Sequence, residues 1–249
     1  MTATRSSFHP VAVKVPGELA TPRREATATG QLLLLCHGLP LSTGGGRIAS
    51  VQLPALAERF SAEAGWAVAV ASLRGVASSP GTFTATGWKD DLVAVMDVLA
   101  PDHAGVVIAG FGFGGALGLR VAIEDDRVRG VATLATPADL AAWCGPAEHF
   151  AEACTRAGVV RGMSSMTPDE LVADVLALDP VGAARAMPPR RFMIVHGADD
   201  RIVPMAAART LLDAADGRAE VRVIQGAGHW LRADPRMVAT VMGWLDRMR

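Results

Sequence analysis

The sequence predicts an α/β fold in which helices cover both faces of a mostly parallel sheet. Short apolar runs alternate with helix-length amphipathic segments along most of the chain. The runs are rich in leucine or β-branched residues and nearly continuous in hydrophobicity, which is typical of parallel strands buried on both faces. A chain of 249 residues is long enough to form one domain of this kind around a single core.

The expected elements follow from these patterns in chain order. The expected strands are residues 11–15, 31–36, 67–71, 105–109, 128–134, 191–195 and 220–224. The expected helices are residues 53–64, 88–99, 114–123, 205–215 and 235–248. The last of these carries apolar residues at helical spacing, namely Val238, Val241, Met242 and Leu245. We expect residues 17–30 to form a turn or a short hairpin.

Residues 137–189 interrupt the alternation, because they have helical patterning and no convincing strand. An insertion between two parallel strands lies where strands end, which is where a cap over a pocket would sit. We therefore expect a core of residues 1–136 and 190–249 and a helical cap of residues 137–189. The alternative is a helical excursion that only covers the sheet. The cap offers four apolar side chains as ligand contacts: Trp143, Phe150, Met163 and Met166.

Composition excludes several classes of partner. The formal net charge is −1 and the basic residues are scattered, so we expect no nucleic-acid partner. No apolar run approaches the ~18 residues that span a bilayer, so we expect no membrane segment. The first residues lack the apolar stretch of a signal peptide, which predicts a cytoplasmic protein. Oligomeric state leaves no signature in the sequence.

Metal and cofactor signatures are also missing. Three cysteines, Cys36, Cys144 and Cys154, are too few and too irregular for a disulfide framework, and no turn motif presents either of the last two as a nucleophile. The chain contains no CxxC, no HExxH and no P-loop pattern. We therefore expect no metal and no cofactor.

The stretch GFGFGG, at residues 110–115, fits two motifs. Gly110, Gly112 and Gly115 match the dinucleotide-binding pattern G-x-G-x-x-G. Alternatively, Gly110 and Gly114 frame a G-x-S-x-G nucleophile elbow in which Gly112 replaces the serine. The dinucleotide motif requires an acidic residue at the end of the next strand, and the sequence has none there. That motif also normally follows the first strand of its fold, whereas at least three expected strands precede the glycines here. The elbow is therefore the favoured interpretation.

Downstream motifs support the elbow. A strand that ends in HGADDRIVP offers Asp200 as an acid, favoured by register over Asp199, and a later strand leads into GAGHWLR with His229. Nucleophile, acid and histidine then follow in the order that an elbow enzyme requires. Upstream, LLLLCHGLP places the N–H of Leu39 at a strand end, and the N–H of Phe113 follows the elbow position. These two amides are the expected oxyanion hole.

These stretches, together with SLRGVASSPGTF at residues 72–83, resemble the α/β-hydrolase superfamily over nearly the whole chain. The resemblance is strongest to small, capped acyl or ester hydrolases related to serine aminopeptidases and thioesterases. It implies an eight-stranded sheet, a cap after the sixth strand, and Asp200 with His229 as the charge-orienting pair. The chain departs from this family at Gly112, where members carry a nucleophile.

Glycine supplies no atom that can attack a carbonyl, so acyl-enzyme chemistry at position 112 is excluded. Ser78 or Ser79, in a loop on the same side of the sheet, could replace the nucleophile, although loop serines usually form turns. His37 and His196 are interpreted as turn formers.

Three functions remain open for a small acyl or ester-like ligand. The first is weak hydrolysis by water that Asp200 and His229 activate, and the second is binding without catalysis. The third is acid–base chemistry of a lyase, cyclase or cofactor-free oxygenase. The cap has no cluster of basic residues that would demand an anionic substrate.

Overall fold

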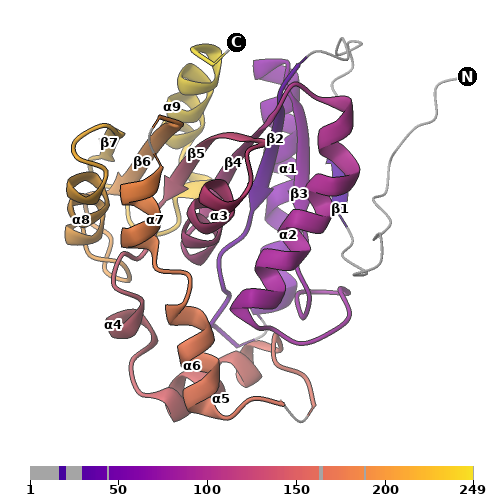
Figure 1. The fold of residues 1–249 in the computed structure, drawn as a ribbon, viewed down its shortest axis with the longest axis vertical. Coiled ribbons are helices and arrows are strands. Elements are labelled where there is room, and N and C mark those ends of the chain that lie inside the picture. Colours follow the sequence, from indigo (N-terminus) through magenta and orange to yellow (C-terminus); the bar gives the residue numbers. More distant parts are fainter. Residues whose placement is uncertain (1–16, 21–29, 44, 163–164, 188, 249) are drawn as a thin grey trace, which may run out of the picture.

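The computed structural model describes residues 17–20, 30–43, 45–162, 165–187 and 189–248. Within these ranges, seven strands form one sheet in the order β1-β3-β2-β4-β5-β6-β7 (Figure 1). All neighbouring strands are parallel except β1 and β3. The strands are β1 (Gly17–Ala20), β2 (Leu32–Cys36), β3 (Ala67–Ala71), β4 (Val106–Phe111), β5 (Val128–Leu134), β6 (Arg191–Gly197) and β7 (Glu220–Ile224).

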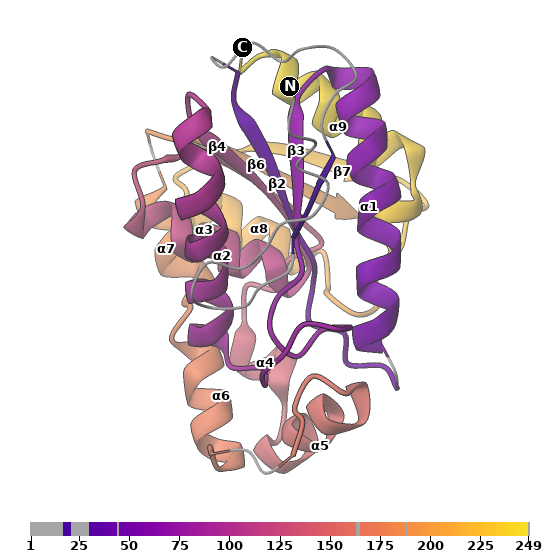
Figure 2. The same cartoon turned by 90° about the vertical axis from the view of Figure 1, so that its right-hand side faces the viewer.

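Helices cover both faces of the sheet, as Figure 2 shows. One face packs against α1 (Gly45–Ala64) and α9 (Pro235–Asp246). The other packs against α2 (Ala85–Leu99), α3 (Phe113–Glu124) and α8 (Ala206–Ala214). Two short 3₁₀ turns, η1 (Ala100–Asp102) and η2 (Leu231–Ala233), complete this part of the chain. The central strands β2 and β4 are buried along their whole length, as the continuous apolar runs predicted.

The expected α/β architecture is confirmed, with differences at the N-terminal edge. The strand expected at residues 11–15 lies outside the described residues. Residues 17–20, expected in a turn or hairpin, form the edge strand β1, because their backbone pairs antiparallel with the open side of β3. The family resemblance implied eight strands, and the described residues contain seven.

The segment between β5 and β6 folds into four helices: α4 (Leu140–Cys144), α5 (Ala147–Ala157), α6 (Pro168–Leu176) and α7 (Pro180–Ala186). Figures 1 and 2 show α4, α5 and α6 together beyond the edge of the sheet. In contrast, α7 lies against α3 and α8, within the helical layer of the core. Asp174 of α6 ties this segment to the core, since its carboxylate accepts hydrogen bonds from the amides of Ala85 and Thr86 at the start of α2.

The loop after β3 is anchored by a buried ion pair. The carboxylate of Asp91, on α2, is fully buried and accepts hydrogen bonds from the Arg74 guanidinium at 2.5 and 3.0 Å and from the Arg74 amide at 2.9 Å. The indole N–H of Trp88 donates to the Arg74 carbonyl at 2.8 Å. Trp88 in turn packs edge-on against the ring of His37, with 5.0 Å between centroids. The ion pair thus supports the loop after β2, where the site lies.

No helix in the described part of the chain is long and apolar enough to cross a lipid bilayer.

We predict that Arg74→Met lowers the free energy of unfolding by about 3 kcal/mol, because it leaves the Asp91 carboxylate buried without its cation. The control is Arg59→Met, which removes a half-exposed i,i+4 pair with Glu63 and should cost less than about 0.5 kcal/mol. Urea denaturation of both variants measures the difference. Equal losses would contradict the anchoring role of the buried pair.

Candidate active site

The elbow is a one-residue turn between β4 and α3. Gly112 has φ +52° and ψ −121°, in the left-handed half of the backbone map. Its N–H donates to the Leu134 carbonyl at 2.7 Å, and its carbonyl accepts from the Gly115 amide at 3.0 Å. A residue with a Cβ adopts such a conformation at a cost of about 1–3 kcal/mol. The turn therefore has the strained geometry of a nucleophile elbow.

The glycines that frame the turn are required by packing. A Cβ on Gly114 would lie 2.5 Å from the His37 carbonyl oxygen and 2.7 Å from that of Cys36. A Cβ on Gly110 would overlap the backbone of Gly114. These contacts let the elbow lie directly against the end of β2.

Gly112 is different, because a side chain would fit there. An ideal Cβ would lie 3.7 Å from His229 Nε2, 3.9 Å from His229 Cε1 and 4.0 Å from Gly38 Cα, all ordinary van der Waals distances. The space beside the Gly112 Cα therefore opens onto the imidazole of His229. Packing does not demand a glycine at this position.

Asp200 and His229 form a hydrogen-bonded pair. Nδ1 of His229 lies 2.9 Å from Asp200 Oδ2. An ionised carboxylate only accepts, so Nδ1 carries the proton and Nε2 faces Gly112 with its lone pair. The other oxygen of Asp200 accepts from the amides of Ile202 and Val203 at 2.9 and 2.8 Å. The carboxylate is fully buried and fixed by three donors, so it orients the imidazole.

Close packing of two loops brings this pair together. The loop after β6 carries Asp200, and the loop after β7 carries His229. The Ala198 amide donates to the carbonyl of Ile224, at the end of β7, at 3.0 Å, and the Asp199 amide donates to the Ala227 carbonyl in the second loop at 2.9 Å. A Cβ on Gly197 would lie 2.5 Å from the Gly228 carbonyl oxygen, so a glycine at the end of β6 permits the contact.

The other two buried histidines have structural hydrogen bonds. His37 Nε2 accepts from the Leu73 amide at 3.3 Å, so its Nδ1 is protonated and donates to the Gly38 carbonyl at 2.9 Å. Burial lowers the pKa of His37 to about 4, which keeps it neutral. His196 donates from Nε2 to the Val203 carbonyl at 2.9 Å. Both bridge their own turns to neighbouring backbone, as turn formers do.

The two expected oxyanion donors, Leu39 and Phe113, both lie near the elbow position. Phe113 is the first residue of α3, so its N–H has no acceptor within the helix. Leu39 follows the His37–Gly38 turn, and Gly38 approaches Phe113 so closely that a Cβ there would lie 3.7 Å from the Phe113 nitrogen. Leu39 and Phe113 line the same cavity as Gly112 and His229. The positive end of α3 adds to their attraction for negative charge.

A cavity of about 380 Å³ lies over the elbow. Most of its wall is apolar and comes from loops of the core. Its lining comprises residues 37–42, Leu53, residues 111–113, Leu134, Trp143, Ile202, Val203 and residues 229–232. Trp143, on α4, stacks on Phe113 with 5.5 Å between ring centroids and 13° between planes. Of the four side chains expected to contact ligand, Trp143 lines the cavity.

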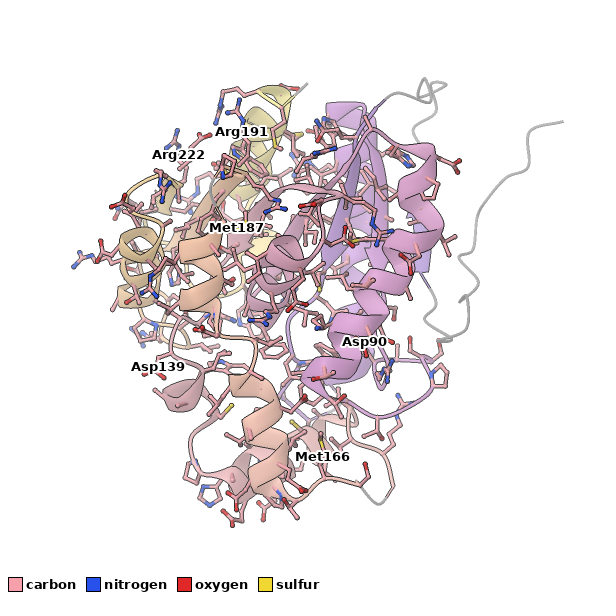
Figure 3. All side chains as sticks on the ribbon, in the orientation of Figure 1. Asp90, Asp139, Met166, Met187, Arg191 and Arg222 are labelled. Atoms are coloured by element: carbon pink, nitrogen blue, oxygen red, sulfur yellow. The ribbon has the colours of Figure 1, made fainter. Side chains whose placement is uncertain are left out.

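Two of the other expected contacts lie outside the cavity lining. Phe150 is buried in the core on the far side of Trp143, at 5.9 Å between ring centroids. Met166 lies between α5 and α6, in the lower part of Figure 3, and packs partly buried against the same core. Met163 lies outside the described residues. Helical patterning marked these residues as apolar, but it does not say toward which side they point.

The alternative nucleophiles do not face the cavity. The hydroxyl of Ser79 is buried and donates to the Ser72 carbonyl at 3.0 Å, and Ser78 is exposed outside the cavity lining. Burial raises the pKa of the Cys144 thiol to about 11 and that of Cys154 to about 12, so both stay protonated near neutral pH. In the described ranges, no group of acidic, histidine and cysteine side chains could hold a metal ion.

The dinucleotide interpretation also lacks its acidic partner in the structure. The turn after β5 places the Thr136 hydroxyl against Gly115. Asp139, the acid nearest in sequence, caps α4 by accepting from the Ala142 amide at 2.9 Å. No carboxylate from this turn therefore points toward the glycines.

The cavity residues that sequence reasoning missed include Ser42, Ile202, Trp230 and Arg232. Ile202 and Trp230 are more than half exposed, although both are large and apolar. Their positions carried a signal, since Ile202 follows Asp200 by two residues and Trp230 and Arg232 directly follow His229. Residues that flank a catalytic acid or histidine share the strand end on which that group is placed.

A parallel sheet with an elbow after β4, an acid after β6 and a histidine after β7 defines the class of α/β-hydrolase folds. A family model described as the alpha/beta hydrolase fold matches residues 31–154. The chain belongs to the α/β-hydrolase family.

Among curated proteins, the chain is similar to the 2-hydroxymuconate semialdehyde hydrolase of Pseudomonas sp. strain CF600. The two are 28% identical over 181 residues, which is 59% of this chain. The match spans 62% of the length of that relative.

Solved structures with a similar fold cover nearly the whole chain. The α/β hydrolase of Penicillium sp. sh18 has a TM-score of 0.71 and 16% identity over 97% of this chain and 96% of its own. The esterase domain from Rhodothermus marinus has a TM-score of 0.67 and 19% identity, over 97% and 95%. The meta-cleavage product hydrolase of Pseudomonas fluorescens IP01 has a TM-score of 0.64 and 17% identity, over 98% of both chains. These similarities establish the shared fold.

The depressed pKa of His37 predicts a pH-dependent loss of stability. Its pKa falls from 6.5 to about 4 on folding, so the contribution of the neutral ring is full above pH 6.5 and is lost as the pH falls toward 4. The loss should approach about 3 kcal/mol. We expect the stability difference between wild type and His37→Gln to shrink by that amount between pH 7 and pH 4, measured by urea denaturation. A constant difference would show that His37 titrates normally.

Proposed function

We propose that this protein hydrolyses an ester or acyl substrate slowly and without a covalent intermediate, using water that His229 deprotonates. The observation that carries this proposal is the space beside the Gly112 Cα, which opens onto the lone pair of His229 Nε2. A water molecule in this space would lie where a serine hydroxyl acts in other members of the fold. The expected roles are His229 as general base, Asp200 as its orienting acid, and the amides of Leu39 and Phe113 as oxyanion donors.

The chemistry needs no further group. Water loses a proton to His229 Nε2 as its oxygen attacks the carbonyl carbon, and the resulting oxyanion accepts from the two amides. Collapse of the tetrahedral intermediate expels the alcohol, which takes the proton back from the imidazolium. Serine hydrolases stripped of triad members keep an acceleration of roughly 10³–10⁴-fold over water, from the oxyanion hole and substrate binding. The expected activity is of that order.

The cavity supports a small substrate with an apolar body. Its volume suits a small organic molecule, and Trp143 and the neighbouring leucines provide apolar contacts. We propose that α4, α5 and α6 act as a cap, with Trp143 as the contact from that cap to the elbow. The name of the curated relative gives 2-hydroxymuconate semialdehyde as a first compound to test beside simple esters.

Two other functions remain as candidates. One is binding without catalysis, and the other is acid–base chemistry that needs no nucleophile. The hydrogen-bonded acid–histidine pair favours chemistry over binding alone, because a purely binding protein has no need of an oriented base. Ester kinetics of the His229 and Gly112 variants distinguish hydrolysis from these two functions.

We predict that His229→Ala reduces hydrolysis of short p-nitrophenyl esters at least ~10-fold, because it removes the general base. Gly112→Ser should instead raise the rate about 10²-fold or more, since its Oγ would lie against Nε2 and open a covalent route. Steady-state kinetics of purified variants with matched melting temperatures measure both effects.

The matched control is Gly112→Ala, which adds the same Cβ at the same strained φ but no hydroxyl. We expect it to be slower than wild type, because its methyl group fills the space of the attacking water. If His229→Ala leaves the wild-type rate unchanged, and Gly112→Ser is no faster than Gly112→Ala, the hydrolytic proposal is wrong.

A further inference from the structure

A buried histidine that the proposed mechanism does not use lies beside the Asp200 carboxylate. His196 is the penultimate residue of β6, and its side chain is fully buried. Its Nε2 donates to the Val203 carbonyl at 2.9 Å, and its Nδ1 has no hydrogen-bond partner among the described residues. A buried N–H at Nδ1 would lack an acceptor, so this nitrogen keeps its lone pair and the ring donates from Nε2.

The turn that carries Asp200 is bound at Val203 through both polar groups of that residue. The Val203 amide donates to Asp200 Oδ1 at 2.8 Å, and the Val203 carbonyl accepts from His196. Val203 is buried, and the residue after it is Pro204, whose nitrogen has no hydrogen to donate. Loss of the imidazole would therefore leave a buried carbonyl without this donor, next to the amide that orients Asp200.

The His196 ring also lies next to the oxygen of Asp200 that holds His229. His196 Nε2 is 3.6 Å from Asp200 Oδ2, and both side chains are buried. This distance is too long for a hydrogen bond, so the polar N–H edge of the ring only adjoins the carboxylate. The same oxygen accepts from His229 Nδ1 at 2.9 Å. A shift of the His196 ring or of Val203 would therefore act directly on the hydrogen bond to His229.

We propose that His196 is a positioning residue, which fixes the direction of Asp200 toward His229 by anchoring the Val203 carbonyl. Without the anchor the Val203 amide would move, and the Asp200 carboxylate would lose a donor that sets its angle. The imidazole of His229 would then be aimed less well at Gly112, and a misplacement of about 1 Å can cost ~10²-fold in rate. The effect of His196 on a reaction rests on the proposed function, whereas its effect on the Asp200–His229 hydrogen bond does not.

NMR spectra of protein with isotope-labelled histidines test this geometry without any reaction. The nitrogen chemical shifts of His196 should show a proton on Nε2 and none on Nδ1 in the wild-type protein. The Nδ1 proton of His229, shifted downfield by its hydrogen bond to Asp200, should be visible in wild type and in His196→Gln, whose side-chain amide still donates. It should be lost by exchange with water in His196→Met, which has a side chain of similar length and no donor.

A second readout is the rate at which an alkyl fluorophosphonate labels Gly112→Ser, since this rate depends on a well-aimed imidazole. Adding His196→Met should slow the labelling at least ~10-fold, whereas adding His196→Gln should change it less than ~3-fold. The matched control is Thr133→Val, which removes another buried side-chain hydrogen bond to a carbonyl of β6, that of Met193. It should leave the His229 signal and the labelling rate unchanged.

Four results would each overturn the inference. They are a proton on Nδ1 of His196, a His229 signal that survives in His196→Met, a signal lost in His196→Gln, and an equal loss in Thr133→Val. If His196→Met does not fold, the wild-type tautomer and the His196→Gln signal decide. The expected signals and labelling rates without any ester hydrolysis by wild type would instead sink the hydrolytic proposal and leave the role of His196 standing. Ester hydrolysis with an unchanged His229 signal in His196→Met would do the reverse.

Discussion

The elbow can form only because the backbone around it is packed more closely than side chains would allow. Gly114 lies against the carbonyls at the end of β2, and Gly110 lies against the backbone of Gly114. This approach brings the loop that carries Leu39 beside the first residue of α3, and both Leu39 and Phe113 line the cavity. It also places the Gly112 Cα so that a Cβ on it would contact the imidazole of His229. Every functional feature of the site depends on that contact.

The acid–histidine pair comes from the loops after β6 and β7, which lie on the other side of β4 from β2. Its carboxylate is ordered by two backbone amides and the imidazole, and a second loop contact holds the histidine over the elbow. In the proposed mechanism this pair deprotonates water instead of a hydroxyl, because both reactions require the same lone pair on Nε2. The cavity, the elbow and the acid–histidine pair therefore lie together at the end of the sheet where β2, β4, β6 and β7 end.

Most of the fold could be predicted from the sequence, because buried parallel strands are nearly continuous apolar runs. Residues 67–71, 128–134 and 220–224 are strands with the expected bounds. The pairing of Asp200 with His229 was also predictable, since motif order determines which strand ends carry them. In contrast, the direction of Phe150 depends on how α5 packs against its neighbours, which no local pattern encodes. Arg232 and Trp230 were missed as cavity residues because their positions depend on the shape of a loop rather than on periodicity.

Covalent labelling with an alkyl fluorophosphonate tests most directly the central claim that Gly112 occupies a nucleophile position facing an intact base. Such a reagent reacts with a hydroxyl that a histidine activates, and mass spectrometry locates the adduct. We expect no adduct on the wild-type protein, one adduct at position 112 in Gly112→Ser, and none when His229→Ala is added to that variant. An adduct on the wild-type protein, at Ser42 or elsewhere, or an unlabelled Gly112→Ser variant would contradict it.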